Sequence, residues 1–140
     1  MDLFTKFNKE NREAKKVLGQ AMVFLRNRKY KEAIEALDPL LQEEQGQDKY
    51  SKKIYQGIWY VLASANQGLS RHEEAATYFA LCLKSDSRDE ELLFSAGLTY
   101  VALKQKEKAV ECLRSLSKHH GLQSPFVRQL ENQIQMINED

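Results

Sequence analysis

The 140-residue chain is poor in residues that break helices and in residues that cross-link chains. It has two prolines, six glycines and two cysteines. So few breakers among many Ala, Leu, Glu, Lys and Gln residues favour helix throughout and disfavour a loop-rich or collagen-like chain. Cys82 and Cys112 both fall inside expected helices, so we expect two buried free thiols and no disulfide framework. The length suits a single domain with a real core.

The sequence also lacks the features that lead a chain to membranes or nucleic acid. No run approaches the ~20 apolar residues that a membrane span needs. Residues 1–4 have no basic region followed by an apolar core, so we expect no secretory signal. The 21 basic and 20 acidic residues are interleaved and leave a net charge of +1, so no broad nucleic-acid footprint is expected. These absences predict a cytoplasmic protein.

Residue patterns that carry chemistry are missing as well. Cys112 and His119 are the nearest approach to a nucleophile and base, but one helix would hold them ~10 Å apart along its axis. A thiol–imidazole hydrogen bond needs ~3 Å. His72 stands alone, no Cys-x2-Cys or His-x3-His spacing occurs, and no glycine-rich phosphate loop is present. The sequence therefore predicts no enzyme, no metal site and no cofactor.

What the chain does contain is a recurring segment. Residues 72–79, HEEAATYF, recur 34 positions later at residues 106–113, KEKAVECL, and an earlier copy, YKEAIEAL, occupies residues 30–37. A fixed period of this size with a small residue in each copy is typical of helical-hairpin repeats. One such hairpin cannot bury its apolar face alone, so stacked neighbours must complete the core.

The spacing of apolar residues predicts helices that alternate with short turns. The expected ranges are about 11–27, 30–44, 51–67, 71–84, 90–103, 106–119 and 125–138. Pro39 should kink the second helix or loosen its last turns. Gly68 should end the third as a left-handed cap. Ser124 and Pro125 should start the last helix, whose one apolar and one polar face suit a terminal cap on a stack.

The three copies resemble the tetratricopeptide repeat, whose helices read Trp-x2-Leu-Gly-x2-Tyr and Ala-x3-Phe. Asn66 departs from the tyrosine slot, and the closing proline is absent. The signature positions are Ala21, Ala33, Trp59, Ala63, Ala75, Gly97, Tyr100 and Ala109. The resemblance implies one all-α domain over residues 1–140, a right-handed superhelical stack. Its three helix-turn-helix repeats would span about 14–45, 56–89 and 90–121, with a capping helix at about 125–138.

In that family the first helices of the hairpins line a concave surface that binds other proteins. Carried over slot by slot, the groove wall would be Leu18, Met22, Leu25, Tyr60, Ser64, Phe94, Leu98 and Val101. Its apolar members would form an exposed patch suited to an apolar peptide or an amphipathic helix. The slots that some family members use to clamp a C-terminal carboxylate hold Leu18, Met22, Val61, Glu91 and Ser95, so an acidic tail is not the expected ligand.

The identity of the partner and the way in which it binds stay open at this point. The N-terminal segment 1–10, with Leu3, Phe4 and Phe7, is one candidate to fill the groove as an extra helix. Two copies of the chain burying their grooves in a homodimer are another, which would make the protein a structural, self-associating subunit. The small free-standing architecture also resembles the tetratricopeptide chaperones of bacterial type III secretion, which shield apolar segments of secreted subunits.

Overall fold

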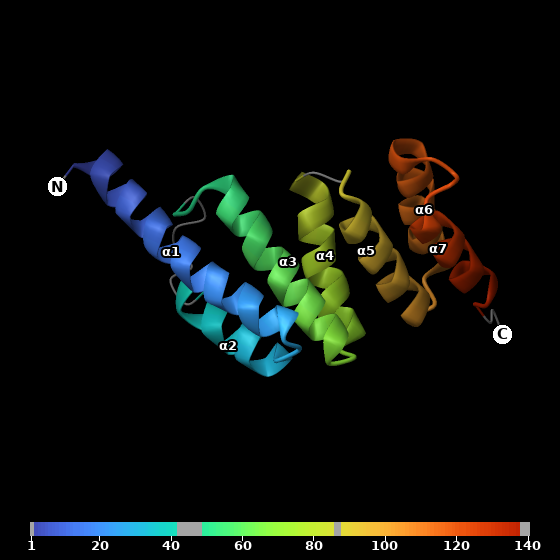
Figure 1. Cartoon of the computed structure of the whole chain (residues 1–140), viewed down its shortest axis with the longest axis horizontal. Helices are drawn as coiled ribbons and strands as arrows, with labels where there is room; N and C mark the ends of the chain where they lie inside the picture. The colour runs from blue at the N-terminus through green and yellow to red at the C-terminus, as the bar shows by residue number, and fades with distance from the viewer. Residues whose placement is uncertain (1, 42–48, 86–87, 138–140) are drawn as a thin grey trace.

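The computed structural model describes residues 2–41, 49–85 and 88–137, and in these ranges every regular element is an α-helix (Figure 1). The helices are α1 (Leu3–Arg26), α2 (Tyr30–Leu41), α3 (Lys52–Gly68), α4 (His72–Ser85), α5 (Glu90–Ala102), α6 (Lys106–His120) and α7 (Pro125–Gln135). The predicted all-α repeat stack is thereby confirmed. Its right-handed superhelical sense stays a prediction, and so do the exact repeat boundaries.

The helices form a curved stack with two layers. They pair as the hairpins α1–α2, α3–α4 and α5–α6, and α7 packs on both helices of the last hairpin. Contacts also join α1 to α3, α3 to α5 and α5 to α7, whereas among the described residues none join α2 to α4 or α4 to α6. Helices α1, α3, α5 and α7 therefore lie side by side, and we call them the inner layer. Helices α2, α4 and α6 form the outer layer. Figure 1 shows the two chain ends at opposite ends of the stack.

One turn geometry closes all three hairpins. Arg28, Ser70 and Lys104 follow the first helix of each hairpin and adopt φ values of 61°, 60° and 58°. The residue after each donates its N–H to the carbonyl five positions back: Lys29 to Phe24 at 2.8 Å, Arg71 to Asn66 at 2.8 Å and Gln105 to Tyr100 at 2.9 Å. This is the Schellman closure of a helix end. The first hairpin thus shares its turn geometry with the other two.

Gly68 has a different role from the left-handed cap that the sequence predicts. It is the last residue of α3, and the left-handed conformation falls two residues later, on Ser70. A Cβ atom at Gly68 would lie 2.4 Å from Cζ of the Tyr30 ring at the start of α2. Glycine is therefore required here because α2 approaches α3 closely, and the prediction of a glycine cap at this position is wrong.

Helix α1 begins eight residues before the predicted start. The Asp2 carboxylate accepts the backbone N–H of Thr5 at 2.7 Å and so caps a helix that opens at Leu3. Leu3 is 86% exposed and Phe4 is 75% exposed. The N-terminal segment is thus a continuation of α1 that projects past the body (Figure 1). The alternative in which it folds back to fill the groove is wrong.

The core is built on the small residues of the repeats. Ala21, Ala33, Ala63, Ala75 and Ala109 are fully buried, Gly97 and Tyr100 are buried, and Trp59 is half-buried. A Cβ at Gly97 would lie 2.7 Å from Cδ2 of Leu130 on α7 and 3.4 Å from Cβ of Cys112 on α6. The small residue at this position therefore allows the capping helix to approach α5, in addition to the hairpin partner.

Trp59 lies where the two halves of the core meet. Its ring stacks between Tyr55 of α3 and Tyr78 of α4, with centroids 6.0 Å away on either side. The buried residues of the first hairpin and of the last hairpin form separate clusters, and Trp59 and Tyr78 pack against both. Stacked aromatic pairs add about 0.5–1.5 kcal/mol each beyond the area that they bury. The middle hairpin thereby joins the two ends of the stack.

Candidate partner-binding groove

Most of the predicted groove wall lies on the inner layer and is partly exposed. Met22 is 41% exposed, and Leu25, Tyr60, Ser64, Phe94, Leu98 and Val101 are half-buried. Leu18 differs from the prediction of an exposed patch, because it is only 9% exposed. A Cβ on Gly57 would lie 2.6 Å from Leu18 Cδ2, so Leu18 fills the space above that glycine. It belongs to the seam between α1 and α3, and the exposure predicted for it is wrong.

Helix α7 adds an apolar side chain to the inner layer. The ring of Phe126 lies against the ring of Phe94, with centroids 4.7 Å apart and planes tilted by 44°. The wall predicted from the sequence does not include Phe126, which lies in the capping helix expected at about 125–138. The signal was available, since α7 follows α6 at the place where the first helix of a fourth repeat would stand.

A polar bridge holds α3 against α5 within the inner layer. The Gln67 side-chain amide donates to the Ser95 carbonyl and to the Thr99 hydroxyl, each at 2.9 Å. The Thr99 hydroxyl in turn donates to the Ser95 carbonyl at 3.0 Å. Thr99 is buried, so leaving these groups unpaired would cost about 1–3 kcal/mol. The bridge fixes the spacing of the two helices that carry Tyr60 and Phe94.

A cavity of about 480 Å³ lies between α3, the end of α4 and the start of α5. Its lining residues are Lys53, Gln56, Gly57, Tyr60, Cys82, Asp89, Glu91 and Leu92. Tyr60 is therefore shared between the predicted wall and this cavity. Asp89 is the N-cap of α5, and its Oδ1 accepts the N–H of Leu92 at 2.8 Å.

The surroundings of Tyr60 place negative charge close to its phenol. Burial raises the pKa of Tyr60 above its usual 10.0, and a hydrogen bond with Ser64 lowers it in part. The carboxylates of Glu91 and Asp89 raise the same pKa further. The phenol therefore stays neutral at physiological pH, and the cavity combines an aromatic ring with two carboxylates.

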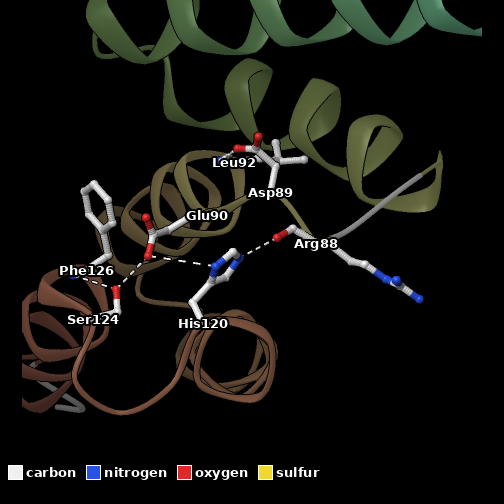
Figure 2. A network of polar contacts seen from close by, with 7 residues as sticks. All are labelled: Arg88, Asp89, Glu90, Leu92, His120, Ser124 and Phe126. Carbon is white, nitrogen blue, oxygen red and sulfur yellow. Dashed lines mark hydrogen bonds and ion pairs between the residues drawn. The ribbon is translucent and has the colours of Figure 1, made fainter.

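A polar network at the same end of α5, its start, joins three helices (Figure 2). The His120 imidazole Nε2 lies 2.6 Å from the Arg88 carbonyl oxygen, and its Nδ1 lies 4.0 Å from Glu90 Oε2. The Ser124 hydroxyl donates to the same Glu90 oxygen at 2.8 Å and accepts the Phe126 N–H at 3.2 Å. These contacts set the start of α5 and the start of α7 against the end of α6.

The cysteines are poor nucleophiles in this fold. Burial raises the pKa of Cys82 to about 11 and that of Cys112 to about 12, where nearby Glu111 adds to the effect. The thiolate that attacks a substrate is therefore scarce at neutral pH. Within residues 2–41, 49–85 and 88–137, no group of three or more His, Cys, Asp or Glu side chains is arranged to hold a metal ion.

Comparison with known proteins identifies the repeats. Residues 57–89 and 90–117 each match the family model of the tetratricopeptide repeat, and these segments cover most of the hairpins α3–α4 and α5–α6. The chain thus carries two tetratricopeptide repeats, in its middle and last hairpins. Searches of curated proteins and of solved structures found no match. None of the helices in the described ranges has both the length and the apolar character needed to cross a bilayer.

Tetratricopeptide repeats generally mediate protein–protein interaction and are typically non-catalytic. The two matched segments contain Tyr60, Ser64, Phe94, Leu98 and Val101 of the predicted wall. Met22 and Leu25 lie outside the match, on α1.

Proposed function

We propose that the protein is an adaptor that holds a segment of another protein along the inner layer of its repeats. The observation that carries the proposal is the row of partly exposed apolar side chains on helices whose opposite faces form the core. Tyr60, Phe94, Leu98 and Val101 follow one another across α3 and α5. A partner that buries this row supplies the neighbour that each inner helix lacks.

The energy available is enough for a useful complex. Burying roughly 400 Å² of apolar surface, counted over both partners, yields about 10 kcal/mol gross at ~25 cal/mol per Å². Loss of translational freedom and ordering of side chains reduce this figure. Because the wall is already half-buried, we expect binding in the micromolar range, about −8 kcal/mol, with the partner's apolar residues supplying much of the area.

A test uses purified protein panned against a phage-displayed library of random short peptides. Leu98→Glu and Tyr60→Glu should each abolish capture of the selected peptides while leaving the helical circular dichroism spectrum intact. Val110→Glu is the matched control, because Val110 is a half-buried apolar residue on α6 in the outer layer. Capture that survives both inner-layer substitutions contradicts the proposal.

Self-association is the second candidate, and exposed Leu3 and Phe4 on α1 favour it. A homodimer that covers apolar surface would be a structural subunit without a peptide ligand. Light scattering distinguishes the two, since the adaptor is a monomer until its partner binds. A narrower form of the adaptor proposal is a cytoplasmic chaperone of secreted subunits, as in bacterial type III secretion, and it rests on architecture alone.

A further inference from the structure

The cavity between α3 and α5 opens at one end of the apolar wall. Tyr60 borders both, and Glu91 precedes Phe94 by one helical turn on α5. At 1.5 Å per residue, Phe94 lies ~4.5 Å and Leu98 ~10.5 Å along the axis from Glu91. A partner segment that lies along α5 and covers Phe94 and Leu98 would therefore place its adjacent side chains in the cavity.

The charge around this cavity is unlike that of a carboxylate-binding site. Asp89 and Glu91 are exposed carboxylates on its rim, and Lys53 is the one cation among the residues that line it. Within the described part of the chain, no ion pair joins Lys53 to either carboxylate. A negatively charged ligand group would meet Glu91 at once, whereas a cation gains a carboxylate partner as it leaves water.

The ring of Tyr60 adds a flat face to this negative rim. Tyr60, Asp89 and Glu91 line the same cavity, and both carboxylates raise the pKa of the phenol. A guanidinium group stacks on aromatic rings and pairs in a forked manner with carboxylates, while an ammonium group acts as a point charge. A cavity of about 480 Å³ has room for either group.

From these observations we propose that the bound segment anchors an arginine in the cavity, between the Tyr60 ring and the Glu91 carboxylate, with apolar residues lying on Phe94 and Leu98. The inference rests on the proposed function and specifies its partner: a basic–apolar segment. In an extended segment, at ~3.3 Å per residue, the arginine and the apolar residue over Leu98 are about three residues apart. In a helical segment they are about seven residues apart.

The test again uses the phage-displayed peptide library, now followed by affinity measurements on synthetic copies of the selected peptides. The wild-type protein selects peptides that contain arginine at this spacing from apolar residues. Replacing that arginine with citrulline, which keeps the shape and removes the charge, weakens binding roughly tenfold, as expected for a charge-assisted hydrogen bond. Raising the salt concentration weakens the arginine peptide more than the citrulline peptide.

The protein side of the test is Glu91→Gln, with Glu111→Gln as its matched control. Glu111 is an exposed carboxylate on α6, away from the inner layer. Glu91→Gln weakens the arginine peptide roughly tenfold and leaves the citrulline peptide unchanged, so the two changes are not additive. Glu111→Gln changes neither, and circular dichroism confirms that both variants fold.

The outcomes separate this inference from the proposed function. If Leu98→Glu abolishes capture while citrulline and Glu91→Gln have no effect, the groove binds a segment but the arginine anchor is overturned. If Leu98→Glu and Tyr60→Glu also have no effect, the groove itself is not the binding surface. Selection of peptides without basic residues overturns the anchor directly.

Discussion

The two ends of the stack differ in how their apolar side chains are covered. At the C-terminal end, α7 buries Val127, Leu130 and Ile134 against the last hairpin and turns its polar residues outward. At the N-terminal end, α1 carries Leu3 and Phe4 into solvent, and no described element packs over them. A repeat stack needs a neighbour on each terminal face. Helix α7 covers the C-terminal face, and among the described residues nothing covers the first turns of α1, which we call the open end.

The open end is exposed because no described element lies beside it, although its apolar residues continue the pattern of the buried part of α1. Leu3, Phe7, Ala14, Leu18 and Ala21 follow the helical spacing of one continuous stripe on α1. The stripe is buried from Ala14 onward, where α3 lies beside it. The Asn11 side chain marks the boundary, because its Oδ1 accepts the N–H of Ser51, the N-cap of α3, at 2.8 Å. Before Asn11, α1 extends past α3.

The largest expected difference between the ends is in the effect of removing one apolar side chain. Leu130→Ala on α7 should lower the free energy of unfolding by about 3–5 kcal/mol, because Leu130 is fully buried and leaves a cavity over Gly97. Phe4→Ala should change it by less than about 0.5 kcal/mol, because Phe4 is already largely in water. Urea unfolding followed by circular dichroism measures both. Equal losses would mean that the N-terminal end is covered in solution.

Replacing one glycine near each end with alanine should change the stability of the protein in opposite directions. Gly97→Ala should destabilise the protein by about 1–3 kcal/mol, because the new Cβ would lie 2.7 Å from Cδ2 of the fully buried Leu130, which would have to shift. Gly19→Ala on α1 should stabilise it by about 0.5–1 kcal/mol, since no atom lies within 4 Å of the added Cβ in mid-helix. Thermal unfolding reports both changes. A destabilising Gly19→Ala would indicate a contact on α1 that the isolated chain does not show.

Much of the architecture could be predicted from the sequence because it depends on local rules. The recurring Ala33, Ala75 and Ala109 located the second helices, and Ser124 with Pro125 located the start of α7. Helix caps and apolar spacing act within a few residues, so a single sequence reveals them. The same holds for the polar outer face of α7.

What could not be predicted depends on contacts between distant segments. The sequence predicts a left-handed cap at Gly68, but the role of this glycine is set by the Tyr30 ring, far earlier in the chain. Leu18 was placed on the groove wall by its slot, but its burial depends on Gly57 in the next repeat. Phe126 joins the inner layer only because α7 follows the path of a first helix. The spacing of residues along the chain does not reveal such contacts between distant segments.

The helix caps at the two ends differ in what their loss should affect. Ser124 caps α7 through its contact with the Phe126 N–H and also donates to Glu90, so Ser124→Ala should lower the free energy of unfolding by about 1–2 kcal/mol. Urea unfolding should show this loss for the whole chain, because α7 is part of the C-terminal core. Ser124→Asp keeps an N-cap acceptor but places it beside Glu90, so it should recover only part of the loss. Full stability in Ser124→Ala would show that α7 does not depend on its cap.

The smallest expected effect is the pH response of the open end. The backbone N–H of Thr5, hydrogen-bonded to the Asp2 carboxylate, holds the pKa of Asp2 below its usual 3.8. A lowered pKa in the folded state means that the cap stabilises the first turn of α1 at pH values above 3.8, and that this contribution is lost as the pH falls below 3.8 through the folded value. Chemical shifts of residues 3–6, recorded by NMR during an acid titration, should therefore report fraying of this turn at low pH. Asp2→Ser retains an acceptor that does not titrate, so its first turn should be insensitive to the same pH change. A fraying transition that persists in Asp2→Ser would assign the effect to another group, and Asp2 would then have no part in holding the overhanging turns of α1.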